Sequence, residues 1–127
     1  MKVSLTLTEG QLAELKQHLF PDDGCEAVAI LLCGRARSDH TQRLLVQKIE
    51  LIPYEECSLR LPDRVTWSTE RLPALLAEAT RRDLAIVKIH GHRGFDWFSE
   101  TDDNSDRELF PSIHAWTDSG PHASVIL

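Results

Sequence analysis

The chain has 127 residues, which is enough for one domain with a real core but too few for two. With 42% hydrophobic and 27% charged residues, it has the composition of a folded globular protein and not of a disordered one. Its formal net charge of −6, without a basic stripe, argues against binding to nucleic acid.

The apolar segments argue against a membrane protein and against a signal peptide. The longest, Ala27 to Cys33, is far shorter than the roughly 20 residues that a membrane span needs. The N-terminus alternates apolar and polar residues and has no continuous apolar region. The three cysteines are an odd number without CxxC spacing, so we expect neither a disulfide framework nor a thiolate zinc site. A reducing cytoplasm is the expected compartment.

The first half of the chain predicts a strand, a helix and a hairpin. Residues 3–7 alternate apolar and polar side chains, as in a half-buried strand. Thr8 is a suitable N-cap for a helix with an apolar stripe, and Pro21 ends that helix. The dense apolar run over residues 25–33 and the alternating run over residues 44–52 predict two antiparallel strands joined by a polar turn.

The second half begins with residues 53–62, whose prolines and acidic pair predict an irregular passage. The elements expected after it are a helix, a strand, a helix and two strands, over residues 68–82, 84–89, 101–109, 113–116 and 123–127. This order predicts a single α/β (α+β) domain over residues 1–127, with helices flanking a mixed, mostly antiparallel sheet. Because the chain stops at its last strand, we expect it to be the first part of a longer protein.

The candidate metal ligands lie at the end of the strand over residues 84–89 and just beyond it. His90 and His92 are two residues apart, so on a strand they face the same side at a spacing of about 6–7 Å. Neutral imidazole is a common zinc ligand, and a catalytic zinc takes three protein ligands and a water. The third ligand should be a carboxylate from the following turn, with Asp102 and Asp103 as the candidates.

A hydrolytic zinc site also needs a base that is not a ligand, and Glu26 is placed as such a base. It is the one charged residue in an apolar strand, where an unpaired carboxylate is costly. Each piece alone also fits a structural role. Glu26 could face solvent on an edge strand. Ser99 and Asp102 could form a helix-capping box. The combination favours a metal site over coincidence.

At these residues the sequence resembles the JAB/MPN (JAMM) family of zinc metalloproteases. The family motif is a glutamate, then HxH, then SxxD, and it stands here as Glu26, His90-Gly91-His92 and Ser99-Glu100-Thr101-Asp102. The resemblance covers essentially the whole chain and is closest to prokaryotic JAB domains associated with ThiF-like adenylating enzymes. It implies a JAB1/MPN-like fold with the layering of cytidine deaminases.

The resemblance also implies an activity, which is zinc-dependent cleavage of a peptide or isopeptide bond after the C-terminal glycine of a ubiquitin-like protein. One zinc per chain would be held by His90, His92 and Asp102. Glu26 would be the general base, and Ser99 would help to stabilise the oxyanion. The expected partners are a ubiquitin-like protein or its conjugates and a ThiF-like adenylating enzyme or domain, without nucleic acid or membrane.

The loop between the ligands departs from the family pattern. Gly91 replaces the usual small hydroxyl residue and Arg93 the usual proline. The segment from His92 to Ser99 is one residue shorter than usual, so that literal spacing would select Asp103 in place of Asp102. These departures motivate the alternative function, a weakly active or non-catalytic MPN module that binds a ubiquitin-like protein or an adenylating-enzyme partner.

Overall fold

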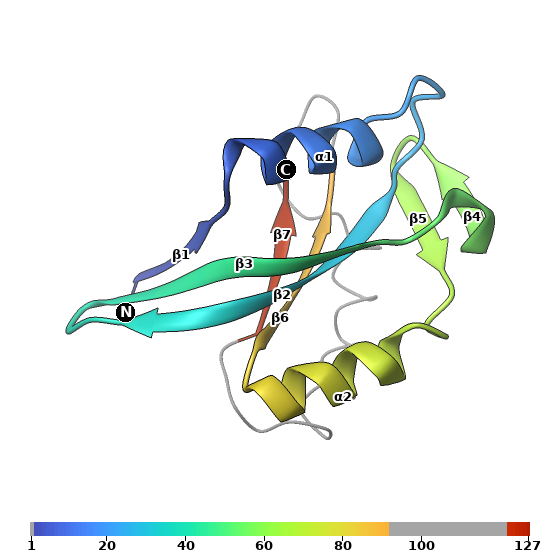
Figure 1. The fold of residues 1–127 in the computed structure, drawn as a ribbon. Helices are drawn as coiled ribbons and strands as arrows, with labels where there is room; N and C mark the ends of the chain where they lie inside the picture. Colours follow the sequence, from blue (N-terminus) through green and yellow to red (C-terminus); the bar gives the residue numbers. More distant parts are fainter. Residues whose placement is uncertain (1, 92–121) are drawn as a thin grey trace.

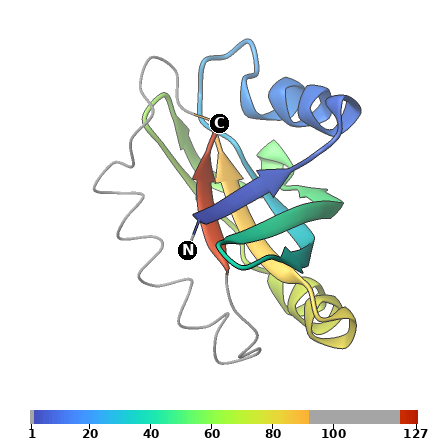
Figure 2. The ribbon, with the colours of Figure 1, turned by 90° about the vertical axis from the view of Figure 1, so that its left-hand side faces the viewer.

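The structure is a computed structural model that describes residues 2–91 and 122–127 (Figure 1). It is an α+β fold in which a curled, mixed sheet lies between two helices (Figure 2). The helix expected over residues 101–109 and the strand expected over residues 113–116 lie outside the described residues. In the described part, no helix is long and apolar enough to cross a membrane.

The described elements follow one another as strands, two α-helices and one short 3-10 helix. In chain order they are β1 (Lys2–Thr6), α1 (Glu9–Leu19), β2 (Val28–Arg37), β3 (Thr41–Leu51), η1 (Tyr54–Glu56), β4 (Cys57–Leu61), β5 (Arg64–Trp67), α2 (Leu72–Arg82), β6 (Ala85–His90) and β7 (Ala123–Ile126).

The main sheet has the strand order β1-β3-β2-β6-β7. Its three central strands pair in antiparallel fashion, and the predicted hairpin of β2 and β3 is confirmed. Both outer strands pair in parallel, β1 with β3 and β7 with β6. The sheet is therefore mixed, as expected, with its antiparallel part at the centre.

The central strand β2 is buried on both faces, which explains its unbroken apolar sequence. Alternate residues enter two separate cores, as the two-residue period of a strand requires. Val28 and Ile30 pack in the core beneath α2, whereas Ala29 and Leu31 pack in the core beneath α1. Figure 1 shows the two helices on opposite sides of the sheet.

The predicted cap of α1 is confirmed in full. Thr8 accepts a hydrogen bond from the Gln11 amide at 3.1 Å, and the Gln11 side chain accepts one from the Thr8 amide at 2.8 Å. This reciprocal capping box satisfies two amides at the helix start that would otherwise lack partners. The helix then ends before Pro21, as its sequence predicts.

Helix α2 begins at Leu72, three or four residues later than predicted. The Ser68 amide donates a hydrogen bond to the carbonyl of Glu56, and the Leu72 amide donates one to the carbonyl of Thr69. The main chain just before Leu72 therefore makes turn hydrogen bonds and not those of an α-helix. Arg71 also pairs with Glu50 and Glu56, which fixes the residue that precedes the helix.

Residues 53–62 are more regular than the sequence analysis predicted. They contain η1 and β4, and β4 forms a separate antiparallel hairpin with β5. The residues of β4 do alternate between apolar and polar side chains, but the prolines and the acidic pair beside them favour an irregular passage. In Figure 1 this hairpin lies at the end of the main sheet where β2 begins.

Candidate functional site

Two of the predicted site residues, Glu26 and His90, come together at one end of the sheet. His90 is the last residue of β6 and pairs with Val28, the first residue of β2. Glu26 lies two residues before Val28 in the chain. The exposed fractions of Glu26 and His90 are only 3% and 2%. Residues separated by more than sixty positions in the sequence therefore supply a buried carboxyl group and a buried imidazole to the same region.

The structure corrects two expectations for Glu26. It does not lie within a strand, because β2 begins only at Val28. Its amide donates to the carbonyl of Leu61 in β4 at 2.8 Å, so this segment pairs with the small hairpin before it joins the main sheet. The alternative in which Glu26 faces solvent on an edge strand is also wrong, since the residue is buried.

The other predicted site residues lie beyond the described part of the chain. They are His92, Ser99, Asp102 and the alternative ligand Asp103. Within residues 2–91 and 122–127, no three histidine, cysteine, aspartate or glutamate side chains form a group that could hold a metal. Of the predicted ligands, the described residues therefore place only His90.

The main chain around Glu26 is held by hydrogen bonds on both sides. Arg60 donates from Nε to the carbonyl of Glu26 at 3.0 Å and from a terminal nitrogen to the carbonyl of Cys25 at 3.3 Å. Asp23 accepts a hydrogen bond from the Cys25 amide at 3.0 Å. Together with the bond to Leu61, these contacts define the path of the segment that carries the buried carboxyl group.

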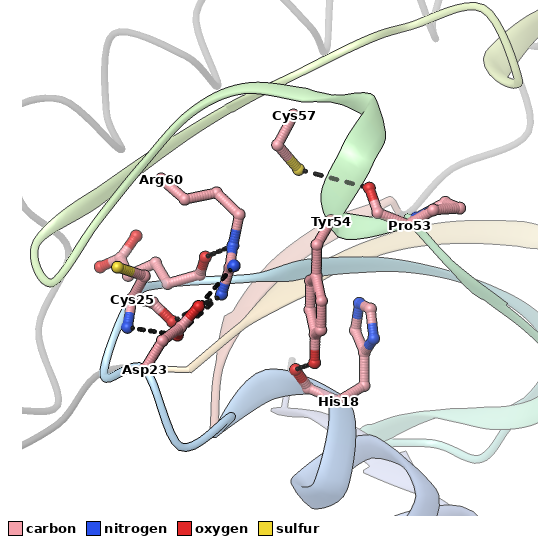
Figure 3. A network of polar contacts seen from close by, with 8 residues as sticks. His18, Asp23, Cys25, Pro53, Tyr54, Cys57 and Arg60 are labelled. Atoms are coloured by element: carbon pink, nitrogen blue, oxygen red, sulfur yellow. Dashed lines mark hydrogen bonds and ion pairs between the residues drawn. The ribbon is translucent and has the colours of Figure 1, made fainter.

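Arg60 itself belongs to a stack of three side chains, seen in Figure 3. Its guanidinium lies 4.2 Å from the ring centre of Tyr54, and the ring of His18 stacks on Tyr54 at 4.8 Å. The Tyr54 hydroxyl donates to the carbonyl of His18 at 2.7 Å, and the His18 ring bonds the carbonyl of Val28 at 3.2 Å. The stack thus joins the end of α1, η1 and β4 to the start of β2.

Neither this network nor the burial of Lys88 is predicted from the sequence. The exposed fraction of Lys88 is 3%, and it lies two residues before His90, on the same side of β6. A lysine inside an apolar strand was the available signal, because lysine is seldom fully buried without a partner. For Arg60, Tyr54 and His18 the sequence offers no comparable signal, since their contacts join distant segments.

The glycine between the two histidines sits against the end of α1. Gly91 is buried, and a Cβ atom built on it would lie 2.8 Å from Cζ and 2.9 Å from Cε1 of Phe20. The same atom would lie 3.2 Å from the carbonyl oxygen of Leu19. The chain can therefore pass this close to α1 only because residue 91 has no side chain.

The three cysteines are free thiols, in agreement with the prediction of no disulfide. Cys33 is buried in β2, and burial raises the pKa of its thiol to about 12. Cys25 and Cys57 are only partly buried, so Cys33 is the one cysteine of the three that lies in the core.

His18 makes stability depend on pH in a predictable direction. Burial lowers the pKa of His18 below its ordinary value of 6.5, and the charge of Arg60 lowers it further, against the hydrogen bonds to Val28 and Ile52. A lowered pKa in the folded state means that this contribution to stability is present above pH 6.5 and is lost as the pH falls through the folded pKa. We expect the melting temperature of His18→Gln to fall less than that of the wild type when the pH is lowered from 7.5 to 5. Equal falls in thermal melts would contradict this assignment.

A buried carboxyl group and a buried imidazole at one end of the sheet are suited to proton transfer or metal binding. Carboxylate and imidazole groups are common general acids and bases, and both are zinc ligands. In the comparisons with known proteins, neither a family model nor a curated protein matches the chain. The function is therefore argued from the residues themselves.

Proposed function

We propose that the chain is a zinc-dependent peptidase or isopeptidase with a JAB1/MPN-like fold, which cleaves after the C-terminal glycine of a ubiquitin-like protein. The observation that carries the proposal is that Glu26 and His90 are both buried, with Glu26 two residues before Val28, the strand partner of His90. The proposed motif needs its glutamate and its first histidine near each other, although the sequence separates them widely. The α+β sheet with a helix on each side agrees with this proposal.

The residues fit a zinc ion by their chemistry and by the placement of His90. In the proposal, His90, His92 and Asp102 hold the metal, which makes two imidazoles and a carboxylate, a ligand set that catalytic zinc sites use. When bound, zinc polarises the scissile carbonyl and lowers the pKa of its water. His90 is buried at the end of β6, where the pairing of this strand with β2 fixes its main chain.

Glu26 is the proposed general base, and it returns the proton to the leaving amine. Val28 pairs with His90 in an antiparallel ladder, and Glu26 lies two residues before Val28, which supports a place for Glu26 near this end of the sheet. We therefore expect the carboxyl group of Glu26 to face the site that His90 and His92 form. Ser99 is proposed to donate a hydrogen bond to the developing oxyanion.

Substituting the proposed third ligand tests the function directly. Asp102→Ala is expected to lose both zinc, measured by elemental analysis, and cleavage of a ubiquitin-like fusion, because a two-histidine site holds the metal weakly. Asp103→Ala is the matched control, since it removes the neighbouring carboxylate and should keep both. Loss of zinc and of cleavage in Asp103→Ala alone would show that Asp103 is the third ligand. Retention of zinc and cleavage in both variants would refute the proposed metal site.

The substrate class follows from the same proposal. A ubiquitin-like protein or its conjugate is the proposed substrate, and a ThiF-like adenylating enzyme or domain is the proposed partner. A protein that binds a ubiquitin-like protein tightly but contains no zinc and shows no turnover would instead favour the non-catalytic module.

A further inference from the structure

We propose that Arg60 is a positioning residue that fixes Glu26 for proton transfer, an inference that rests on the proposed role of Glu26 as the base. The guanidinium of Arg60 donates to the carbonyls of Glu26 at 3.0 Å and Cys25 at 3.3 Å. The carbonyl of the next residue, Leu61, accepts the amide of Glu26 at 2.8 Å. Adjacent residues of β4 thus hold the peptide groups on both sides of the Glu26 α-carbon.

Further contacts hold the guanidinium of Arg60 in place (Figure 3). Its two terminal nitrogens donate hydrogen bonds to the two carboxylate oxygens of Asp23 at 2.8 and 3.2 Å, and the guanidinium lies against the face of Tyr54. Only 14% of its side chain is exposed. An arginine can make these contacts together because its donors are fixed in one plane, whereas lysine offers a single flexible ammonium group.

This arrangement limits the motion of Glu26 to its own side-chain torsions. A general base must lie within hydrogen-bond reach of the proton that it takes, so a displaced main chain would remove it from that range. A misplacement of ~1 Å from a remote change can lower a rate by ~10²-fold. Arg60 acts through Glu26 in this proposal, and no contact of Arg60 with the substrate is needed.

The test compares Arg60→Met, Arg60→Lys and the wild type. In Arg60→Met, kcat for a ubiquitin-like fusion is expected to fall by ~10- to 100-fold because Glu26 loses its fixed position, while KM and zinc content stay the same. Arg60→Lys keeps the charge and part of the hydrogen bonding, so it should recover part of kcat. The amide of Glu26 should exchange with solvent faster in Arg60→Met, measured by NMR hydrogen exchange without reference to activity.

Arg71→Met provides a matched control, because it also removes an arginine that bonds both oxygens of a carboxylate. Arg71 bonds the carboxylate of Glu56 at 2.9 and 2.8 Å and that of Glu50 at 2.7 Å. These contacts tie the start of α2 to β3 and η1, and none of them involves Arg60 or Glu26. The variant should lower thermal stability but leave kcat and the Glu26 amide unchanged.

The outcomes separate the positioning role from the proposed function. If zinc-loaded wild-type protein does not cleave the fusion, the proposed function fails, and the catalytic consequence of Arg60 fails with it. If the wild type turns over but Arg60→Met keeps the same kcat as Arg71→Met, the function stands and the positioning role is overturned. Unchanged exchange of the Glu26 amide in Arg60→Met would overturn the positioning role in either case.

Discussion

Glu26→Gln is expected to abolish measurable cleavage of a ubiquitin-like fusion while the protein stays folded and keeps its zinc. Glutamine has nearly the same shape but cannot accept the proton, and loss of a general base lowers rates by ~10²–10⁴-fold. Because Glu26 is not a proposed ligand, elemental analysis should still find one zinc per chain. The loss should appear in kcat, measured at saturating fusion substrate.

Glu55→Gln is the control for this substitution. Glu55 lies in η1 and is exposed, so the same change of charge there should leave kcat as in the wild type. Persistent cleavage in Glu26→Gln would remove the base from the proposal and would leave burial of this carboxyl group without a catalytic reason. Loss of zinc in Glu26→Gln would instead make Glu26 a ligand.

The fold was predictable where burial is regular along the sequence. The helix from Thr8 to Pro21 has a cap, an apolar stripe and a stop, and all three are local features. The hairpin of β4 and β5 was not predicted, although both strands alternate apolar and polar residues. The prolines and the acidic pair beside this segment favour an irregular passage and outweigh a period that extends over only five and four residues.

The site was predictable only as a set of residue types. The grouping of Glu26 with His90 comes from the motif, and the antiparallel pairing of β2 with β6 places His90 opposite Val28, two residues after Glu26. The sequence does not indicate that Arg60 holds the main chain of Glu26, because that contact joins residues 34 positions apart.

The contacts of Gly91 with Phe20 and Leu19 explain why a glycine stands between the two histidines. Among proteins that this sequence resembles, a small hydroxyl residue is usual at this place, and its absence weakened the resemblance. Here the ring of Phe20 and the carbonyl of Leu19 occupy the space that a Cβ would take. A side chain at residue 91 would therefore require Phe20 or the chain near Leu19 to shift, which gives Gly91 a reason in packing that is independent of any metal site.

Gly91→Ser is accordingly expected to damage the protein, although it restores the residue usual in the resembling family. Its Cβ would lie 2.8 Å from Cζ of Phe20 and 3.2 Å from the carbonyl oxygen of Leu19, distances that force a shift. Overpacking of this kind costs about 1–3 kcal/mol of the free energy of unfolding, measured by denaturant titration. Because Gly91 follows His90 directly, the shift should also lower zinc affinity.

A second substitution decides whether Phe20 is the cause. Phe20→Leu removes the two ring atoms nearest to residue 91, so the double variant Phe20→Leu/Gly91→Ser should be more stable than the sum of the single changes predicts, by about 0.5–3 kcal/mol. Gly10→Ser is the control, because a Cβ there would meet only Thr8 Oγ1, at 3.9 Å. If the effects of the two substitutions on the free energy of unfolding simply add, the strain lies at the carbonyl of Leu19. This carbonyl is part of the main chain, so no side-chain substitution would relieve the strain. In that case residue 91 would have to be glycine whatever residue stands at position 20.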